Sequence, residues 1–61
     1  MKEYCVKGGY CTENYMAKTA SDAVDFFIDE YYPDWNVIGA FENKFECSGP
    51  CGTEIVSVRE A

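Results

Sequence analysis

The segment Thr19-Ala-Ser-Asp-Ala-Val-Asp-Phe-Phe-Ile-Asp-Glu-Tyr-Tyr-Pro33 carries the clearest structural pattern in this chain. Its apolar residues recur at the spacing of one helix face, and they are Ala20, Ala23, Val24, Phe27, Ile28 and Tyr31. Thr19 is a favourable N-cap, and Asp22 three residues later completes a capping-box-like start. Pro33 cannot continue a helix and pushes Tyr32 out of the helical region. The sequence therefore predicts a helix over residues 20–32 with one buried face.

Strands are expected on both sides of this helix. Residues 3–18 read as a hairpin, because Gly8-Gly9 can supply the positive φ angles of a tight turn. Residues 35–47 read as one extended run with a possible interruption at 42–44, and residues 54–59 as a last short strand. The prediction is a single α+β domain over residues 1–61, with the order ββαββ and an antiparallel sheet that packs against one helix.

The size and charge of the chain limit what it can bind. A domain of 61 residues buries only about 60% of its unfolded surface, so a stabilising device is expected. The net charge is −6 and histidine is absent. Such a chain repels nucleic acid and anionic membranes, and its expected partners are basic protein surfaces. The alternative is that the acidity only keeps a small protein soluble.

Four cysteines form two close pairs, and each pair encloses a glycine-containing loop. The pairs are Cys5 with Cys11, and Cys47 with Cys51 in the knuckle-like segment 47–52. The N-terminus lacks the apolar run of a secretory signal, which favours a cytoplasmic protein with reduced thiols. Four reduced cysteines without histidine fit a closed, structural zinc site that would tie the two chain ends together. With zinc and four thiolates the net charge becomes −6 − 4 + 2 = −8.

Other uses of these cysteines stay open at this point. Two disulfides, for which three connectivities are possible, would suit a secreted protein. Free thiols and an iron–sulfur centre are two further interpretations. The segment Cys47-Ser-Gly-Pro-Cys51 is one residue longer than the usual redox motif of oxidoreductases.

The helix face opposite the core stripe is acidic. Asp22, Asp25 and Asp29 lie there, and Glu30 is beside them. Phe26 lies among these acids, about 130° from the centre of the apolar face. An aromatic side chain surrounded by carboxylates suits a partner whose apolar pocket is bordered by Lys or Arg. The alternative is an ordinary surface aromatic, which is common.

Catalysis is not expected from this sequence. No histidine is available as a base, and no pair of the eleven carboxylates stands out from a solvated surface. The aromatic residues between Tyr31 and Trp35 are expected to pack in the core and at its rim. We therefore expect a binding protein and not an enzyme.

In size, acidity and its set of four cysteines, the chain resembles the small zinc-binding anti-CRISPR proteins that inhibit Cas9. The points of resemblance are Cys5, Cys11, Cys47 and Cys51 as zinc ligands and the acidic face of the predicted helix. The resemblance implies a phage protein that acts in the bacterial cytosol without enzyme activity. It would bind Cas9 or its guide complex and block DNA loading at a basic channel.

Two alternatives to this interpretation belong to other classes. One is a zinc-stabilised structural module that binds another basic partner. The other is a secreted, disulfide-bonded miniprotein.

Overall fold

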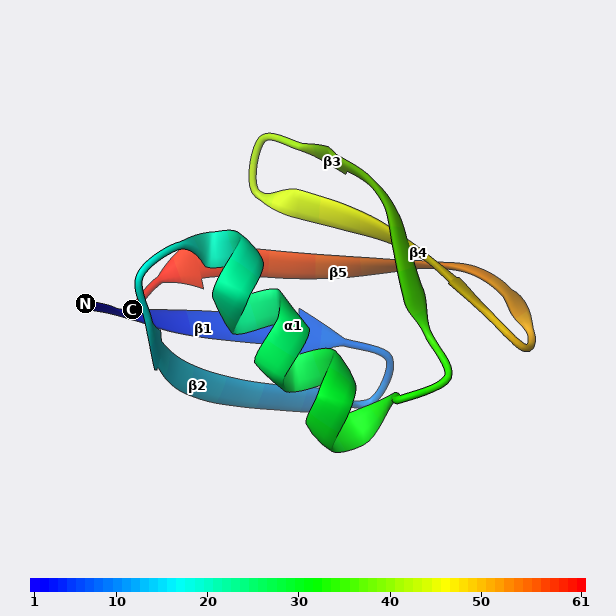
Figure 1. Cartoon of the computed structure of the whole chain (residues 1–61), viewed down its shortest axis with the longest axis horizontal. Helices are drawn as coiled ribbons and strands as arrows, with labels where there is room; N and C mark the ends of the chain where they lie inside the picture. The colour runs from blue at the N-terminus through cyan, green and yellow to red at the C-terminus, as the bar shows by residue number, and fades with distance from the viewer.

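The computed structural model describes all 61 residues as one helix on one face of a five-stranded sheet (Figure 1). The elements are β1 (Lys2–Gly8), β2 (Cys11–Ala17), α1 (Ala20–Tyr31), β3 (Asn36–Phe41), β4 (Lys44–Gly49) and β5 (Gly52–Glu60). All neighbouring strands are antiparallel, in the order β2-β1-β5-β4-β3. The helix α1 packs on β2, β1 and β5, so β3 and β4 extend beyond it.

The predicted ββαββ order is wrong, because the chain contains a fifth strand. The segment 35–47, expected as one extended run, reverses at Glu42 and Asn43 and forms the hairpin of β3 and β4. Glu42 adopts a φ of 54°, in the left-handed region, which is uncommon for residues other than glycine and is therefore not expected of a glutamate. The turn is held from outside the hairpin, since the Val58 N–H donates to the Asn43 carbonyl over 2.9 Å. A contact with β5 thus stabilises the reversal.

The helix prediction is confirmed to within one residue. The hydroxyl of Thr19 accepts a hydrogen bond from the Asp22 N–H over 3.1 Å, as expected of an N-cap. The buried residues of α1 are Ala23, Val24, Phe27 and Ile28. The helix ends at Tyr31, because Tyr32 leaves the helical region immediately before Pro33.

The core lies between α1 and one face of the sheet. Successive side chains of a strand point to opposite faces, and in β1 Tyr4 and Val6 are buried while Lys7 is exposed. The same alternation buries Val56 and Val58 of β5. The core side chains are Tyr4, Val6, Ala17, Ala23, Val24, Phe27, Ile28, Phe45, Cys47, Val56 and Val58. The second face of the sheet, which carries Lys7, has no covering layer.

The two chain ends are joined by backbone pairing between β1 and β5. The register runs from Tyr4 opposite Glu60 to Gly8 opposite Val56. The Ala61 N–H donates to the Glu3 carbonyl over 2.9 Å and adds one further bond. Figure 1 shows both termini side by side. The helix α1 is too short and too polar to cross a membrane.

Candidate functional site

The structure separates the four cysteines that the sequence predicted as ligands of one zinc ion. Cys5 lies between the buried Tyr4 and Val6 and therefore on the uncovered face of the sheet. Cys11 packs at the edge of the core on the helix side and Cys47 is fully buried there, whereas Cys51 is exposed in a turn.

This separation corrects the zinc-stapled architecture. No group of three or more Cys, Asp or Glu side chains is close enough to hold a metal ion. Strand alternation places Cys5 on the face opposite to Cys11 and Cys47, and Cys51 lies outside the strands in an exposed turn. The ends of the chain are held by β1–β5 pairing instead. Zinc binding by these cysteines stays a prediction.

The two glycine turns, which suggested metal-binding loops, instead accommodate two aromatic side chains. Each is a two-residue hairpin turn, and Tyr32 and Trp35 lie against them with rings stacked at 4.0 Å. A Cβ atom on Gly9, whose φ is 57°, would lie 2.3 Å from the Tyr32 hydroxyl. A Cβ atom on Gly49 would lie 2.7 Å from the Trp35 indole. The glycines therefore make room for a stacked aromatic pair between the two hairpins.

The hydroxyl of Tyr32 links this aromatic pair to the β1–β2 hairpin. It accepts a hydrogen bond from the Tyr10 N–H over 3.0 Å and donates to the Cys11 sulfur over 3.5 Å. The bond to Cys11 raises the pKa of Tyr32. Beside the pair lies a hollow of about 460 Å³, which we call the aromatic hollow and which is lined by Gly9, Tyr10, Tyr32, Trp35, Cys51 and Glu54. Glu54 is the only carboxylate in this lining, and no Lys or Arg belongs to it.

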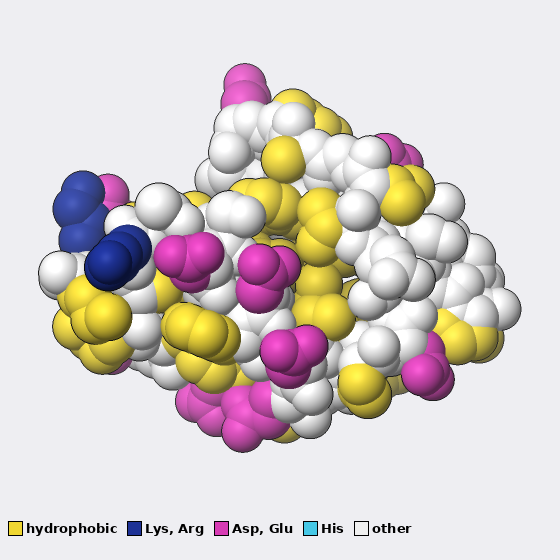
Figure 2. All heavy atoms as spheres, viewed as in Figure 1, with side chains coloured by type: hydrophobic (Ala, Val, Ile, Leu, Met, Phe, Trp, Pro, Cys, Tyr) yellow, Lys and Arg dark blue, Asp and Glu magenta, His cyan; other side chains and the backbone are white.

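The predicted acidic residues lie together on the outer surface of α1. Asp22, Asp25, Asp29 and Glu30 are all exposed, and Figure 2 shows acidic side chains along the helix. We call this set of four residues the acidic helix face. None of them forms an ion pair. The one ion pair of the molecule joins Lys2 to Glu60 over 3.5 Å. The helix itself contains no Lys or Arg.

Phe26 lies within the acidic helix face and is half exposed, at 48%. Its ring centroid is 6.1 Å from that of Tyr15 on β2, so the aromatic ring is supported on one side. The exposed part of the ring remains free for contact. Phe26 is therefore an exposed aromatic residue that packs on one side against β2.

Two tyrosine–carboxylate hydrogen bonds fasten α1 to the edge strand β2. Tyr15 donates to Glu30, and Tyr31 donates to the carboxylate of Glu13 over 2.9 Å. The pKa of Tyr15 is raised by burial and by its bond to Glu30. The bond to Glu13 raises the pKa of Tyr31 to about 12. Glu30 thus has a structural partner inside the protein. The role of Glu13 is not predictable from the sequence, because a lone acid on a strand carries no signal.

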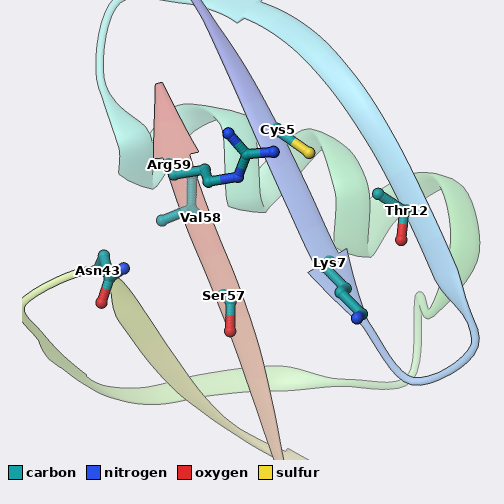
Figure 3. Close-up of a pocket in the computed structure, with 7 residues that line it drawn as sticks. All are labelled: Cys5, Lys7, Thr12, Asn43, Ser57, Val58 and Arg59. Atoms are coloured by element: carbon teal, nitrogen blue, oxygen red, sulfur yellow. The ribbon is translucent and has the colours of Figure 1, made fainter. Parts of the chain in front are cut away.

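A polar hollow of about 340 Å³ lies on the uncovered face of the sheet, and no sequence pattern predicted it (Figure 3). Its lining comes from β1, β2, β5 and the β3–β4 turn, and consists of Cys5, Lys7, Thr12, Asn43, Ser57, Val58 and Arg59. Strand pairing assembles it, since Cys5 is opposite Arg59 and Lys7 is opposite both Ser57 and Thr12. The lining comes from residues 5–12, residue 43 and residues 57–59, which are far apart in the sequence, so strand pairing is needed to bring them together.

The candidate site therefore has an acidic helix face with an aromatic centre, an aromatic hollow and a polar hollow. Their function must be inferred from the residues themselves, because no protein-family model matches the chain, and no curated protein and no solved structure gives a significant match.

Proposed function

We propose that this protein is a non-catalytic binding protein that uses the acidic helix face to engage a basic surface of a partner protein. The observation that carries the proposal is a charge arrangement that is unfavourable for the helix itself. Asp25 and Asp29 are four residues apart, where like charges destabilise a helix by about 0.2–0.5 kcal/mol. Asp29 and Glu30 occupy the last turn, where the helix dipole favours cations by about 0.3–1 kcal/mol.

The stability of the fold accounts for two of these four carboxylates and leaves the other two unexplained. Asp22 is in the first turn, where a carboxylate is favourable, and Glu30 accepts a hydrogen bond from Tyr15. Asp25 and Asp29 have no partner in the molecule and only oppose helix formation. A Lys or Arg on a partner would relieve this repulsion, and charge complementarity would also speed association.

Phe26 supplies an apolar centre for the same contact. Aromatic residues that fill a pocket of the partner often contribute most of the binding energy of an interface. The ring is already positioned by Tyr15, so binding would order it at little entropic cost.

The aromatic hollow suits the same class of partner. A Lys or Arg side chain entering it would meet Tyr10, Tyr32 and Trp35 together with the carboxylate of Glu54. A cation near an aromatic face gains about 0.5–1 kcal/mol at an exposed site. The basic partner could therefore be contacted at two places.

The specific form of this proposal is an inhibitor of Cas9 or its guide complex. Its support is the resemblance in size and acidity, together with the basic channel in which Cas9 holds its guide–target duplex. An acidic protein of net charge −6 could occupy part of that channel and block DNA loading. The other form is an interaction module for a different basic partner.

Two experiments test the two levels of the proposal. The first measures the binding of the protein to Cas9–guide complex by calorimetry between 50 and 500 mM salt, and compares the double variant Asp25→Asn/Asp29→Asn with the equally charged control Glu42→Asn/Glu46→Asn. We expect the first double variant and Phe26→Ala to lose about tenfold or more in affinity, and the control to lose much less.

The second experiment measures DNA cleavage by Cas9 with a large excess of this protein. Unhindered cleavage and no binding would rule out the Cas9 form. The general proposal would then be tested on other basic proteins, and would fail if the helix-face variants bound them as tightly as the control did.

A further inference from the structure

We propose that the polar hollow on the uncovered sheet face binds a small phosphate-type anion, either free phosphate or the phosphate group of a small phosphomonoester. This site is separate from the proposed partner surface, because it lies on the opposite face of the sheet from α1 (Figure 3). The inference therefore does not depend on the proposed function.

The charge of the hollow is opposite to that of the rest of the protein. Two of the five basic residues, Lys7 and Arg59, line it, and no carboxylate does. Neither cation forms an ion pair, although the chain contains eleven Asp and Glu residues. Glu3, on the same face, accepts a hydrogen bond from the Asn14 amide and is outside the lining. Two unpaired cations in one depression of so acidic a molecule favour an anionic ligand.

The remaining polar groups of the hollow suit phosphate oxygens. Thr12 and Ser57 contribute hydroxyl donors, and Asn43 contributes an amide. The guanidinium of Arg59 presents a planar fork that matches two oxygens of a phosphate, and Lys7 adds a compact positive charge. Antiparallel pairing fixes the positions of Lys7, Ser57 and Arg59 on two adjacent strands.

The ligand must be small. A volume of about 340 Å³ is at the lower end of small-molecule pockets, which span about 300–1,000 Å³. Outside the two lining cations the protein carries a charge of −6 − 2 = −8, which would repel an extended polyanion such as nucleic acid. A single phosphate group meets the local positive charge without contacting the acidic helix face.

The test is an NMR titration of the ¹⁵N-labelled protein with inorganic phosphate, with phenyl phosphate, and with chloride at matched ionic strength. We expect both phosphates to shift the amide signals of Lys7, Thr12 and Ser57, and chloride to leave them in place. Lys7→Gln and Arg59→Gln should each weaken binding about fivefold, the factor for one charge at about 4 Å in water. Lys18→Gln removes the same charge outside the hollow and should change the affinity less than twofold.

The two phosphate arms also distinguish the sources of the ligand. Tighter binding of phenyl phosphate would assign the site to a phosphomonoester, and equal binding would assign it to free phosphate. Shifts that chloride reproduces, or that survive both Lys7→Gln and Arg59→Gln, would overturn the proposal.

Cys5 provides a second, independent readout inside the hollow. We compare its alkylation by anionic iodoacetate and neutral iodoacetamide, with Cys51 as the exposed reference thiol. In both reactions the thiolate sulfur displaces iodide and the thiol proton goes to solvent. The ratio of the iodoacetate rate to the iodoacetamide rate should be several-fold higher at Cys5 than at Cys51, and should fall in Arg59→Gln. Equal ratios at the two cysteines would contradict an anion-attracting hollow.

Discussion

Replacing Asp29 by Lys should stabilise the free protein and weaken its binding to a basic partner. Asp29 is exposed, has no ion-pair partner, and lies in the last turn of α1. The substitution turns a like-charge pair with Asp25 into an attractive one, and each of these terms is about 0.2–0.5 kcal/mol. It also places a cation at the helix C-terminus, where the dipole contributes about 0.3–1 kcal/mol.

Together these terms stabilise the fold by about 1 kcal/mol, which raises the Tm of a domain of this size by about 4–8 °C. The assay is thermal unfolding followed by circular dichroism at low salt and at 1 M salt. Because the charges are exposed, most of the gain should disappear at 1 M salt, where the Debye length is about 3 Å.

The matched control is Asp22→Lys, which changes the net charge equally but lies in the first turn, where a carboxylate is favourable. We expect the Tm of Asp29→Lys to exceed that of Asp22→Lys by several degrees. Equal Tm values would show that only the net charge matters, and the claim that Asp29 opposes helix formation would then be refuted.

Four further predictions follow from other parts of the structure. Phe27→Ala should destabilise the protein by about 3–5 kcal/mol in urea unfolding, because the ring is fully buried; a loss below about 1 kcal/mol would contradict the described core. Tyr31 should titrate at about 12 by absorbance at 295 nm. This pKa is raised above the unfolded value of about 10, so the stabilisation from the Tyr31–Glu13 hydrogen bond is present below pH 10 and is lost as the pH rises toward 12. The variant Tyr31→Phe should show a smaller loss of stability over that pH range. Gly49→Ala should cost about 1–3 kcal/mol through its clash with Trp35, and less in a Trp35→Ala background; an equal cost in both backgrounds would remove Trp35 from the explanation. A chelator should leave the Tm of the reduced protein unchanged, because β1–β5 pairing joins the chain ends; a fall of about 10 °C or more would restore a structural metal site.

The helix was predictable because its signals are local. The N-cap at Thr19, the apolar spacing through Phe27 and the stop before Pro33 each depend on residues only one or two helical turns apart. The clustering of Asp22, Asp25 and Asp29 on one surface follows from the same periodicity. The position of Phe26 among them was likewise correct, although its contact with Tyr15 was not foreseen.

The cysteines illustrate why the rest of the site was not predictable. Close spacing in the sequence suggested that Cys47 and Cys51 act together, yet one is buried in the core and the other is exposed at a hairpin turn. Burial also raises the pKa of the Cys47 thiol and makes it a poor nucleophile. Spacing alone does not reveal on which face of a sheet a strand residue lies.

From the sequence alone, the helix, its cap, its apolar stripe and its acidic surface could be determined, because helical hydrogen bonds join residues four apart. Only the tertiary structure revealed the fifth strand, the pairing of the two chain ends and the assembly of Lys7, Ser57 and Arg59 around one hollow. The fifth strand depends on a turn at Asn43 that Val58 of β5 holds through a hydrogen bond. The other two features depend on the register between β1 and β5, about fifty residues apart, where a shift of one residue would send each side chain to the other face of the sheet.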